Sequence, residues 1–373
     1  MKKLHIVSFN VPYPANYGGV IDVFYRIKAL RNLGVDIELH TFQYGRPESK
    51  ELQELCGNVH YYRRRTGILS AMSPRPYIVQ SRRSSRLIDN LNKDDAPILL
   101  EGLHCCYLLE KIENRRFFVR AHNVEHDYYS SLAEVEHSLP RRLYLRSDAR
   151  KLERYEPILR KADTILAVTE NDAEHFRSIG CPKVLLMPSS HIDDSVVSKP
   201  SQLLSKDECY VLYHADLSVP ENVESVLFLA NNVFRNSTHR FVVAGRNPAP
   251  AVSEALCKLQ NTKLYANPDE TEMQSLIANS QVILMTTPMP TGLKLKLLNS
   301  LYAGRHCLVN SAMVAGTKLG ELCTIADSAQ DLRDALDRLM VTPFTTEDIE
   351  RRQNLLGSLY SNQANARILL SLL

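Results

Sequence analysis

The chain has 373 residues, which is long for a single hydrophobic core and suits two domains of ordinary size. Its hydrophobic content of 44% and charged content of 23% are typical of a soluble enzyme, and a formal charge of +3 is too small to indicate a nucleic-acid-binding protein. No apolar run approaches the ~20 residues of a membrane span, and the first residues look like a strand and not a signal peptide. We therefore expect a cytoplasmic protein.

Short apolar segments alternate with segments of helical period through the first half of the chain. A strand at residues 4–9 is followed by a loop with Gly18 and Gly19, a helix that ends at Gly34, and a strand at residues 36–42 whose alternation predicts one polar face. Further strands are expected at 58–62, 97–100, 117–120, 164–168 and 183–187, and helices at 76–92, 141–162 and 170–179. This order predicts a parallel sheet with the Gly18-Gly19 loop at the carboxyl end of its first strand.

A polar segment without hydrophobic period follows, and we place an interdomain linker at residues 191–206. A second alternating series then begins. Its strands are expected at 209–214, 240–244, 263–265, 281–285, 306–309 and 323–325, and its helices at 222–234, 250–259, 269–278 and 329–340. The predicted fold class is α/β, with two doubly wound Rossmann-like domains, residues 1–190 and 207–354, facing across a cleft.

The stretch TPMPTGLKLKLLNSLYAG, residues 287–304, joins a strand to a helix that is expected to run from Leu293 to Gly304. Such a junction lies at the carboxyl edge of a parallel sheet, where free N–H groups and the helix dipole favour an anion. Lys294 and Lys296 would suit a diphosphate. The alternative is that both lysines extend from an ordinary amphipathic helix into solvent.

The eight cysteines lack the short spacings of a zinc site, so we expect free thiols in a reducing compartment. No Asp-x-Asp pair follows a strand in a way that indicates a metal. We therefore expect no bound metal.

Four segments together resemble the retaining glycosyltransferases of the GT-B fold, and bacterial members of family 4 in particular. They are the Gly18-Gly19 loop, RAHNVEHDYY at 120–129, AGRNP at 244–248 and PTGLKLKLLNSLYAG at 290–304. The resemblance implies a nucleotide-sugar donor held mainly by the second domain, an acceptor held mainly by the first, and a terminal helix, residues 355–373, that packs back on the first domain. It implies neither a cofactor nor a catalytic metal.

The same resemblance assigns the site residues. The catalytic residues would be His122, Asn123 and Lys296, with His122 beside the reacting sugar. The donor-binding residues would be Gly18, Gly19, Arg246, Thr291, Gly292, Leu293, Lys294, Lys296 and Asn299.

Several positions depart from the family pattern. Thr291 and Asn299 stand where two glutamates are common, and Asp216 stands near a usual arginine, with Glu221 and Asn222 near a usual lysine. Arg246 is a candidate for the missing cation, and the alternative is that it is a surface turn residue.

Two clusters of arginine fall in the first domain, around residues 63–86 and 141–154. They suggest an anionic or lipid-linked acceptor and a reversible contact with the anionic inner membrane. The alternative is a solvated basic face. Nucleic acid is not expected, because aromatic residues do not interleave with the arginines.

The sequence thus predicts a retaining, metal-independent hexosyltransferase that acts in assembly of a bacterial surface polysaccharide or glycoconjugate. Two alternatives remain open. One is a catalytically silent GT-B module that serves as a binding or partner subunit, and the other is a sugar-nucleotide 2-epimerase.

Overall fold

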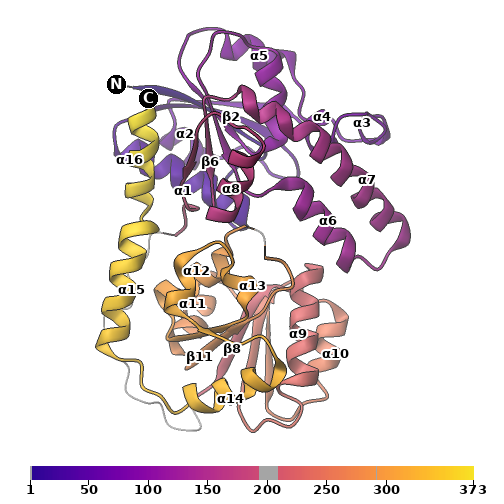
Figure 1. The fold of residues 1–373 in the computed structure, drawn as a ribbon, viewed down its shortest axis with the longest axis vertical. Coiled ribbons are helices and arrows are strands. Elements are labelled where there is room, and N and C mark those ends of the chain that lie inside the picture. The colour runs from indigo at the N-terminus through magenta and orange to yellow at the C-terminus, as the bar shows by residue number, and fades with distance from the viewer. Residues whose placement is uncertain (1, 193–208, 291) are drawn as a thin grey trace. The chain divides into compact units, whose positions relative to one another are not determined.

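The computed structural model of the chain describes residues 2–192, 209–290 and 292–373 (Figure 1). These residues form two compact units. Unit 1 comprises residues 2–192, 292–293 and 358–373, and unit 2 comprises residues 209–290 and 294–357. Most of the linker expected at residues 191–206 lies outside the described residues.

Unit 1 is built on a seven-stranded parallel sheet with the strand order β3-β2-β1-β4-β5-β6-β7. The strands are β1 (Lys3–Ser8), β2 (Asp36–Gln43), β3 (Asn58–Arg63), β4 (Ile98–Glu101), β5 (Phe117–Ala121), β6 (Thr164–Ala167) and β7 (Val184–Leu186). The order reverses between β1 and β4. In sheets of this kind, ligands bind at the carboxyl ends of the strands beside such a reversal.

Helices cover both faces of this sheet. They are α1 (Gly18–Asn32), α2 (Lys50–Leu55), α3 (Ile68–Ala71), α4 (Tyr77–Gln80), α5 (Ser85–Leu91), α6 (Glu125–Val135), α7 (Leu139–Tyr155), α8 (Glu170–Ser178) and α16 (Asn362–Leu372), with the 3₁₀ segments η1 (Leu103–Glu110) and η2 (Glu156–Lys161). On one face, Leu369 of α16 shares a core with Ile27 of α1 and Ile6 of β1, and Figure 1 shows α16 beside α1. On the other face, Leu152 of α7 and Phe176 of α8 form a second core.

Unit 2 is built on a six-stranded parallel sheet with the order β10-β9-β8-β11-β12-β13. Its strands are β8 (Val211–Asp216), β9 (Phe241–Arg246), β10 (Thr262–Ala266), β11 (Val282–Met285), β12 (His306–Val309) and β13 (Thr324–Ile325). Its helices are α9 (Pro220–Asn232), α10 (Pro250–Leu256), α11 (Glu270–Asn279), α12 (Leu295–Ala303), α13 (Ser311–Val314) and α14 (Ala329–Leu339), with η3 (Lys318–Leu322), and α15 (Thr346–Leu359) follows them. Here the order reverses between β8 and β11. The prediction of two doubly wound parallel sheets is confirmed.

Two predicted helices are wrong in extent. The helix expected at 76–92 is divided into α4 and α5, because Ser84 accepts a hydrogen bond from the N–H of Leu87 and so begins a new helix. The helix expected at 141–162 ends at Tyr155, because Pro157 cannot donate the next backbone hydrogen bond, and η2 continues the chain.

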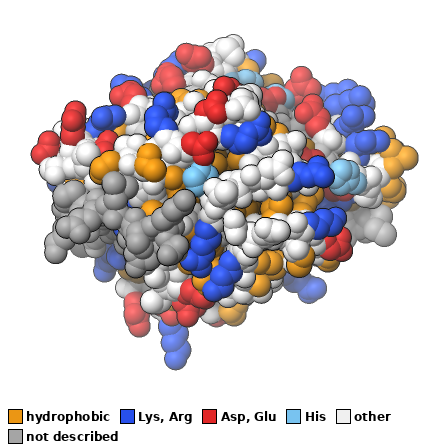
Figure 2. Space-filling model, turned by 90° about the horizontal axis from the view of Figure 1, so that it is seen from below, with side chains coloured by type: hydrophobic (Ala, Val, Ile, Leu, Met, Phe, Trp, Pro, Cys, Tyr) orange, Lys and Arg blue, Asp and Glu red, His pale blue; other side chains and the backbone are white. Residues whose placement is uncertain are grey.

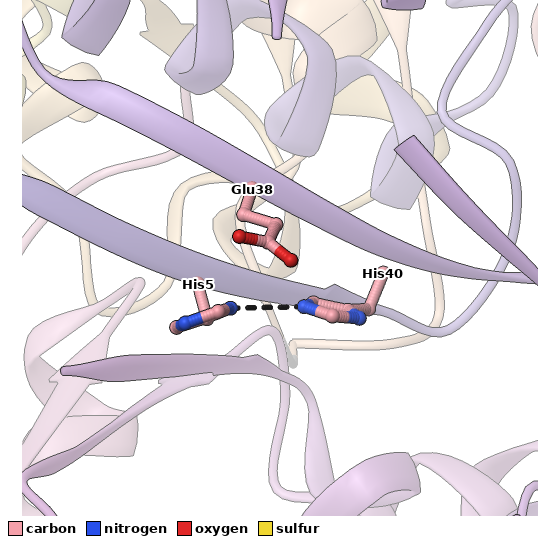
Figure 3. A group of neighbouring side chains, drawn as sticks. All are labelled: His5, Glu38 and His40. Carbon is pink, nitrogen blue, oxygen red and sulfur yellow. Dashed lines mark hydrogen bonds between the residues drawn. The ribbon is translucent and has the colours of Figure 1, made fainter. Parts of the chain in front are cut away.

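The polar face predicted for the strand at 36–42 is also wrong. Glu38 is 8% exposed and His40 is 0% exposed, so both faces of β2 are buried. The polar side chains meet one another instead of water, and Figure 3 shows His40 hydrogen-bonded to His5 of β1 with Glu38 beside them. Alternation alone could not distinguish a solvated face from a buried polar network.

Candidate functional site

The loop after β1 brings Gly18 and Gly19 to the start of α1, at the carboxyl edge of the unit 1 sheet. The N-cap residue Tyr17 makes no side-chain cap, so the first N–H groups of α1 can face an anion. A Cβ on Gly19 would lie 2.6 Å from Cζ of Phe9, whereas none of the described atoms lies within 4 Å of a Cβ on Gly18. A side chain at position 19 would therefore displace the ring of Phe9, whereas position 18 has open space beside the backbone.

His122 lies directly after β5, where two buried carboxylates hold its ring. Its Nε2 lies 3.1 Å from Oε2 of Glu101, at the end of β4, and its Nδ1 lies 3.3 Å from Oδ2 of Asp22 on α1. Phe9 packs edge-on against the ring with the two centroids 5.6 Å apart. The side chain is 12% exposed. Both ring nitrogens are thus engaged within unit 1, and the exposed part of the ring is its edge.

Two arginines neutralise the carboxylates that hold His122. Nη2 of Arg26 lies 2.9 Å from Asp22 and 3.1 Å from Glu101, and Nε of Arg120 donates to Oδ2 of Asp22 at 2.9 Å. Although burial opposes ionisation, the charges of Arg120, Arg26 and His122 hold the pKa of Asp22 below its ordinary value. Asp22 and Glu101 are 1% and 0% exposed. The network therefore fixes the ring of His122 at the edge of the sheet.

The sequence interpretation missed Asp22 and Glu101. A signal existed for Glu101, because it ends an otherwise apolar buried strand and a charge in that place needs a partner. Asp22 carried no such signal, since acidic residues are common near helix starts. Asn123 follows His122 in the same loop and is partly exposed.

In unit 2, Lys296 lies in the first turn of α12, where the chain leaves the carboxyl edge of the sheet. Its Nζ donates to Oδ1 of Asn222 at 2.8 Å and lies 5.3 Å from the ring centroid of Tyr213. Burial, reinforced by the charge of Lys294, lowers the pKa of Lys296 to about 8, although Glu221 opposes this shift. Lys296 is thus a half-buried cation that loses its proton at a lower pH than an exposed lysine does.

Two helix starts meet at this lysine. Asn222 lies in the first turn of α9, and its Nδ2 donates to the backbone oxygen of Asp216 at the end of β8 at 2.9 Å. Neither α9 nor α12 has a side-chain N-cap hydrogen bond. Because β8 adjoins the reversal of the strand order, backbone donors and the Lys296 ammonium group gather where this sheet is expected to bind an anion.

The remaining predicted donor residues are placed as follows. The helix begins at Leu295 and not at Leu293, with Lys294 as the N-cap residue. Gly292 has a φ of +67°, a left-handed conformation that glycine adopts without strain. Thr291 lies outside the described residues, and Asn299 is partly exposed on α12.

Arg246 ends β9 and is in register with Asp216 of β8, so both lie at the carboxyl edge. Asp216 already accepts from the N–H and Oγ of Ser218, at 3.1 Å and 2.6 Å. The carboxylate that replaces the usual arginine is therefore engaged in its own turn. The cationic side chains near this edge are therefore Lys296, Lys294 and Arg246.

No protein-family profile matches the chain. A curated relative from Klebsiella pneumoniae, described as an uncharacterized 44.6 kDa protein in the cps region, is 25% identical over 380 residues, covering 96% of this chain and 92% of its own. The lipopolysaccharide outer core galactosyltransferase WaaB has a TM-score of 0.64 at 15% identity, covering 100% of both chains. The Anabaena protein HepE in complex with UDP and glucose has a TM-score of 0.62 at 13% identity, covering 100% of this chain and 99% of its own.

These similarities extend over nearly the whole of both chains. They agree with the two parallel sheets and their strand orders. The chain therefore has the GT-B fold of two Rossmann-like units, as the sequence resemblance predicts.

Proposed function

We propose that the chain is a retaining glycosyltransferase that moves a sugar from a nucleotide-sugar donor to a glycan or lipid-linked acceptor in assembly of a bacterial surface polysaccharide or glycoconjugate. The GT-B fold supports this proposal, as do the UDP and glucose in HepE and the activity in the name of WaaB. The cps-region origin of the Klebsiella pneumoniae relative points to the same process.

The observation that carries the proposal is Lys296 at the start of α12. A half-buried ammonium group is costly unless an anion or polar partner faces it, and here its neutral partner is the amide of Asn222. An incoming diphosphate would pair directly with the ammonium group, whose charged form Glu221 already favours, and would also meet the uncapped N–H groups of α9 and α12. The proposed donor site therefore satisfies groups that the chain leaves incompletely neutralised.

The proposed mechanism needs no protein nucleophile. The leaving diphosphate assists attack by the acceptor on the same face of the sugar, so the chain has to orient both substrates and stabilise charge on the diphosphate. Lys296 would neutralise part of that charge, and His122, held by Asp22 and Glu101, would orient the sugar. No cofactor and no metal are proposed for this transfer.

UDP binding is expected to weaken as the pH rises through about 8. Lys296 attracts a diphosphate only when protonated, and its pKa in the free chain is about 8. The second ionisation of a phosphate group lies at about pH 6, so the diphosphate of UDP is almost fully ionised above about pH 7.5. Calorimetric titration with UDP from about pH 7.5 to about pH 9, below the loss of the uracil N3 proton, measures the effect.

The matched control is Lys296→Arg, whose guanidinium stays protonated throughout. This variant should bind UDP with little change over that range. An affinity of the parent chain that does not depend on pH would remove Lys296 from the diphosphate site. Absence of binding to UDP, GDP, ADP and CMP and their sugars would instead favour the catalytically silent module.

We further propose that α7 makes a reversible contact with an anionic membrane surface. No helix of the described residues is both long and apolar enough to cross a bilayer. On α7, however, Leu139 and Leu143 are 56% and 57% exposed, and the exposed Arg146 lies one turn from Leu143. In Figure 2, basic and hydrophobic side chains adjoin at the right-hand edge, the side to which α7 extends in Figure 1. Such a mixture suits the interface of an anionic leaflet.

Leu139→Asn combined with Leu143→Asn is expected to weaken binding to anionic liposomes at least tenfold. Burying one leucine contributes roughly 1.5–3 kcal/mol, and each arginine near the surface adds about 1 kcal/mol. Co-sedimentation at low salt measures the partition. The control is Val341→Asn, because Val341 is an apolar side chain that is 70% exposed and belongs to unit 2. Equal loss in the control, or no binding by the parent chain, would reject the contact.

A further inference from the structure

Among the described residues, three groups of histidine and carboxylate side chains bring one ligand atom each within 4.8 Å of one another. The groups are His5 with Glu38 and His40, Asp22 with Glu101 and His122, and His126 with Glu156 and His175. All three belong to unit 1. They differ in whether the chain itself already satisfies the ligand atoms.

The first group, drawn in Figure 3, is satisfied by hydrogen bonds. Nδ1 of His5 bonds to Nε2 of His40 at 2.9 Å, Nε2 of His5 to Asp94 at 2.9 Å, and Nδ1 of His40 to Tyr62 at 2.9 Å. One proton on each ring completes this chain of bonds, ending on the Asp94 carboxylate. Burial lowers the pKa of His40 to about 3, which agrees with neutral rings. No ring nitrogen is left for an ion.

The second group is occupied by positive charge. Arg26 pairs with both Asp22 and Glu101, and Arg120 donates to Asp22. A metal cation placed between these carboxylates would be repelled by two buried guanidinium groups. This group therefore belongs to the network that holds His122.

In the third group the carboxylate faces two histidines instead of arginines. His126 is the second residue of α6, Glu156 begins η2, and His175 lies on α8. Nε2 of His175 lies 2.6 Å from Oε2 of Glu156, and Nδ1 of His126 lies 3.4 Å from Oε1. Nδ1 of His126 is buried and has this longer contact with Glu156 in place of a hydrogen bond of normal geometry. Within residues 2–192, 209–290 and 292–373, no lysine or arginine forms an ion pair with Glu156.

We propose that His126, Glu156 and His175 bind a divalent transition-metal ion, with zinc as the best chemical fit. Two imidazoles and one carboxylate are ligands that zinc prefers, and a set of three protein ligands leaves a fourth position open to water or another ligand. Tetrahedral bonds of about 2.0–2.1 Å place ligand atoms roughly 3.3 Å apart. The three ligand atoms here lie within 4.8 Å of one another, so side-chain shifts would bring them to that spacing.

The surroundings of the group favour an ion as well. His126 and His175 are 17% and 25% exposed, so an ion can reach them from solvent. Oδ1 of Asp127 lies 3.4 Å from Nε2 of His126, the ring nitrogen that would not bind the ion. Metal-binding histidines commonly have a carboxylate partner at that second nitrogen. A pocket of about 190 Å³ between α6 and α7 is lined by His126 and adjoins the group. The open coordination position could therefore face solvent or a small ligand.

A bound ion would connect α6, η2 and α8. The start of α6 directly follows the loop that carries His122 and Asn123. The ion would thus restrain that loop from outside the network of Asp22 and Glu101. This role is separate from the proposed sugar transfer, which uses no metal.

Titration of the chelator-treated full chain with zinc alone tests the proposal. We expect one zinc per chain by calorimetry. His126→Gln and His175→Gln should each weaken binding by about 100-fold or more, since loss of a partner outside the ligand shell already costs about 10–100-fold. Cobalt(II) should give the visible absorption of a four-coordinate site in the parent chain, and both variants should lose it.

All proteins in this test carry Cys257→Ser, because Cys257 is an exposed thiol that could bind zinc. The matched control is His239→Gln, which removes a histidine of unit 2 that pairs with Asp337 at 2.6 Å and belongs to none of the three groups. Zinc affinity should not change in this variant. No zinc binding by the parent chain, or unchanged affinity in both site variants, would overturn the proposal. If a site variant without metal melts at a lower temperature than the parent chain, its loss of zinc binding could reflect partial unfolding. The test then rests on the cobalt spectrum of the parent chain, and absence of a four-coordinate spectrum would reject the site.

Discussion

Lys296→Ala is expected to weaken UDP binding at least tenfold, which corresponds to about 1.4 kcal/mol. The variant removes the half-buried ammonium group from the point where α9 and α12 begin, while the N–H groups of both helices remain. The loss in the rate of sugar transfer should exceed the loss in binding, because charge on the leaving diphosphate grows in the transition state. Calorimetry and initial-rate measurements with the same donor give the two quantities.

The matched control for this prediction is Lys318→Ala, which removes an exposed lysine of unit 2 at the start of η3. It should leave both UDP affinity and transfer rate unchanged. Equal effects of the two substitutions would indicate a general charge effect. An unchanged affinity in Lys296→Ala would show that the diphosphate, if bound, lies elsewhere.

Arg120→Ala is expected to lower the free energy of unfolding by about 3–5 kcal/mol, the range for breaking a buried ion pair. Arg120 is 0% exposed, donates to Asp22 at 2.9 Å, and donates to backbone oxygens of Leu166 and Ala167 at 3.3 Å and 3.5 Å. Its removal leaves these acceptors unsatisfied and a carboxylate incompletely paired. Urea unfolding followed by circular dichroism measures the change.

Arg177→Ala provides the comparison, because Arg177 pairs with Glu170 at 2.6 Å with both side chains nearly half exposed. An exposed pair contributes about 0–1 kcal/mol. A similar small loss in both variants would mean that the buried network does not carry the stability assigned to it. A large loss in Arg120→Ala alone would support it.

The alternation of apolar and helical segments predicted both parallel sheets because each buried strand is short, apolar and bounded by turn residues. The same reasoning failed at β2, where the alternating Glu38 and His40 indicate a solvated face but are buried. The partners that make their burial tolerable lie far away in the sequence: Lys3 and His60 pair with Glu38, and His5 bonds to His40. The periodicity of apolar residues is a local property of one segment, so it contains no information about partners from other segments.

The candidate site shows the same limit. The strand-loop-helix junction around Lys296 could be predicted, because its glycine, prolines and lysines are local in the sequence. The amide of Asn222 could not, since the contact joins two helices 74 residues apart. Likewise, the histidine and carboxylate side chains of the proposed metal site come from three separate elements, so no spacing motif exists. The assigned roles of Gly18, Gly19, His122, Asn123 and Arg246 remain predictions.

Residues 358–373 belong to unit 1, where Leu369 and Leu372 of α16 share a core with Ile27 of α1, and Figure 1 marks both chain ends on this unit. In the gene, the segment that encodes unit 2 is therefore flanked on both sides by segments that encode unit 1. A single recombination event that exchanged everything after the linker would give unit 1 a foreign α16 and a mismatched hydrophobic surface. Two crossovers, before residue 209 and near residue 357, would exchange unit 2 as a cassette and preserve the native pairing of α1 with α16.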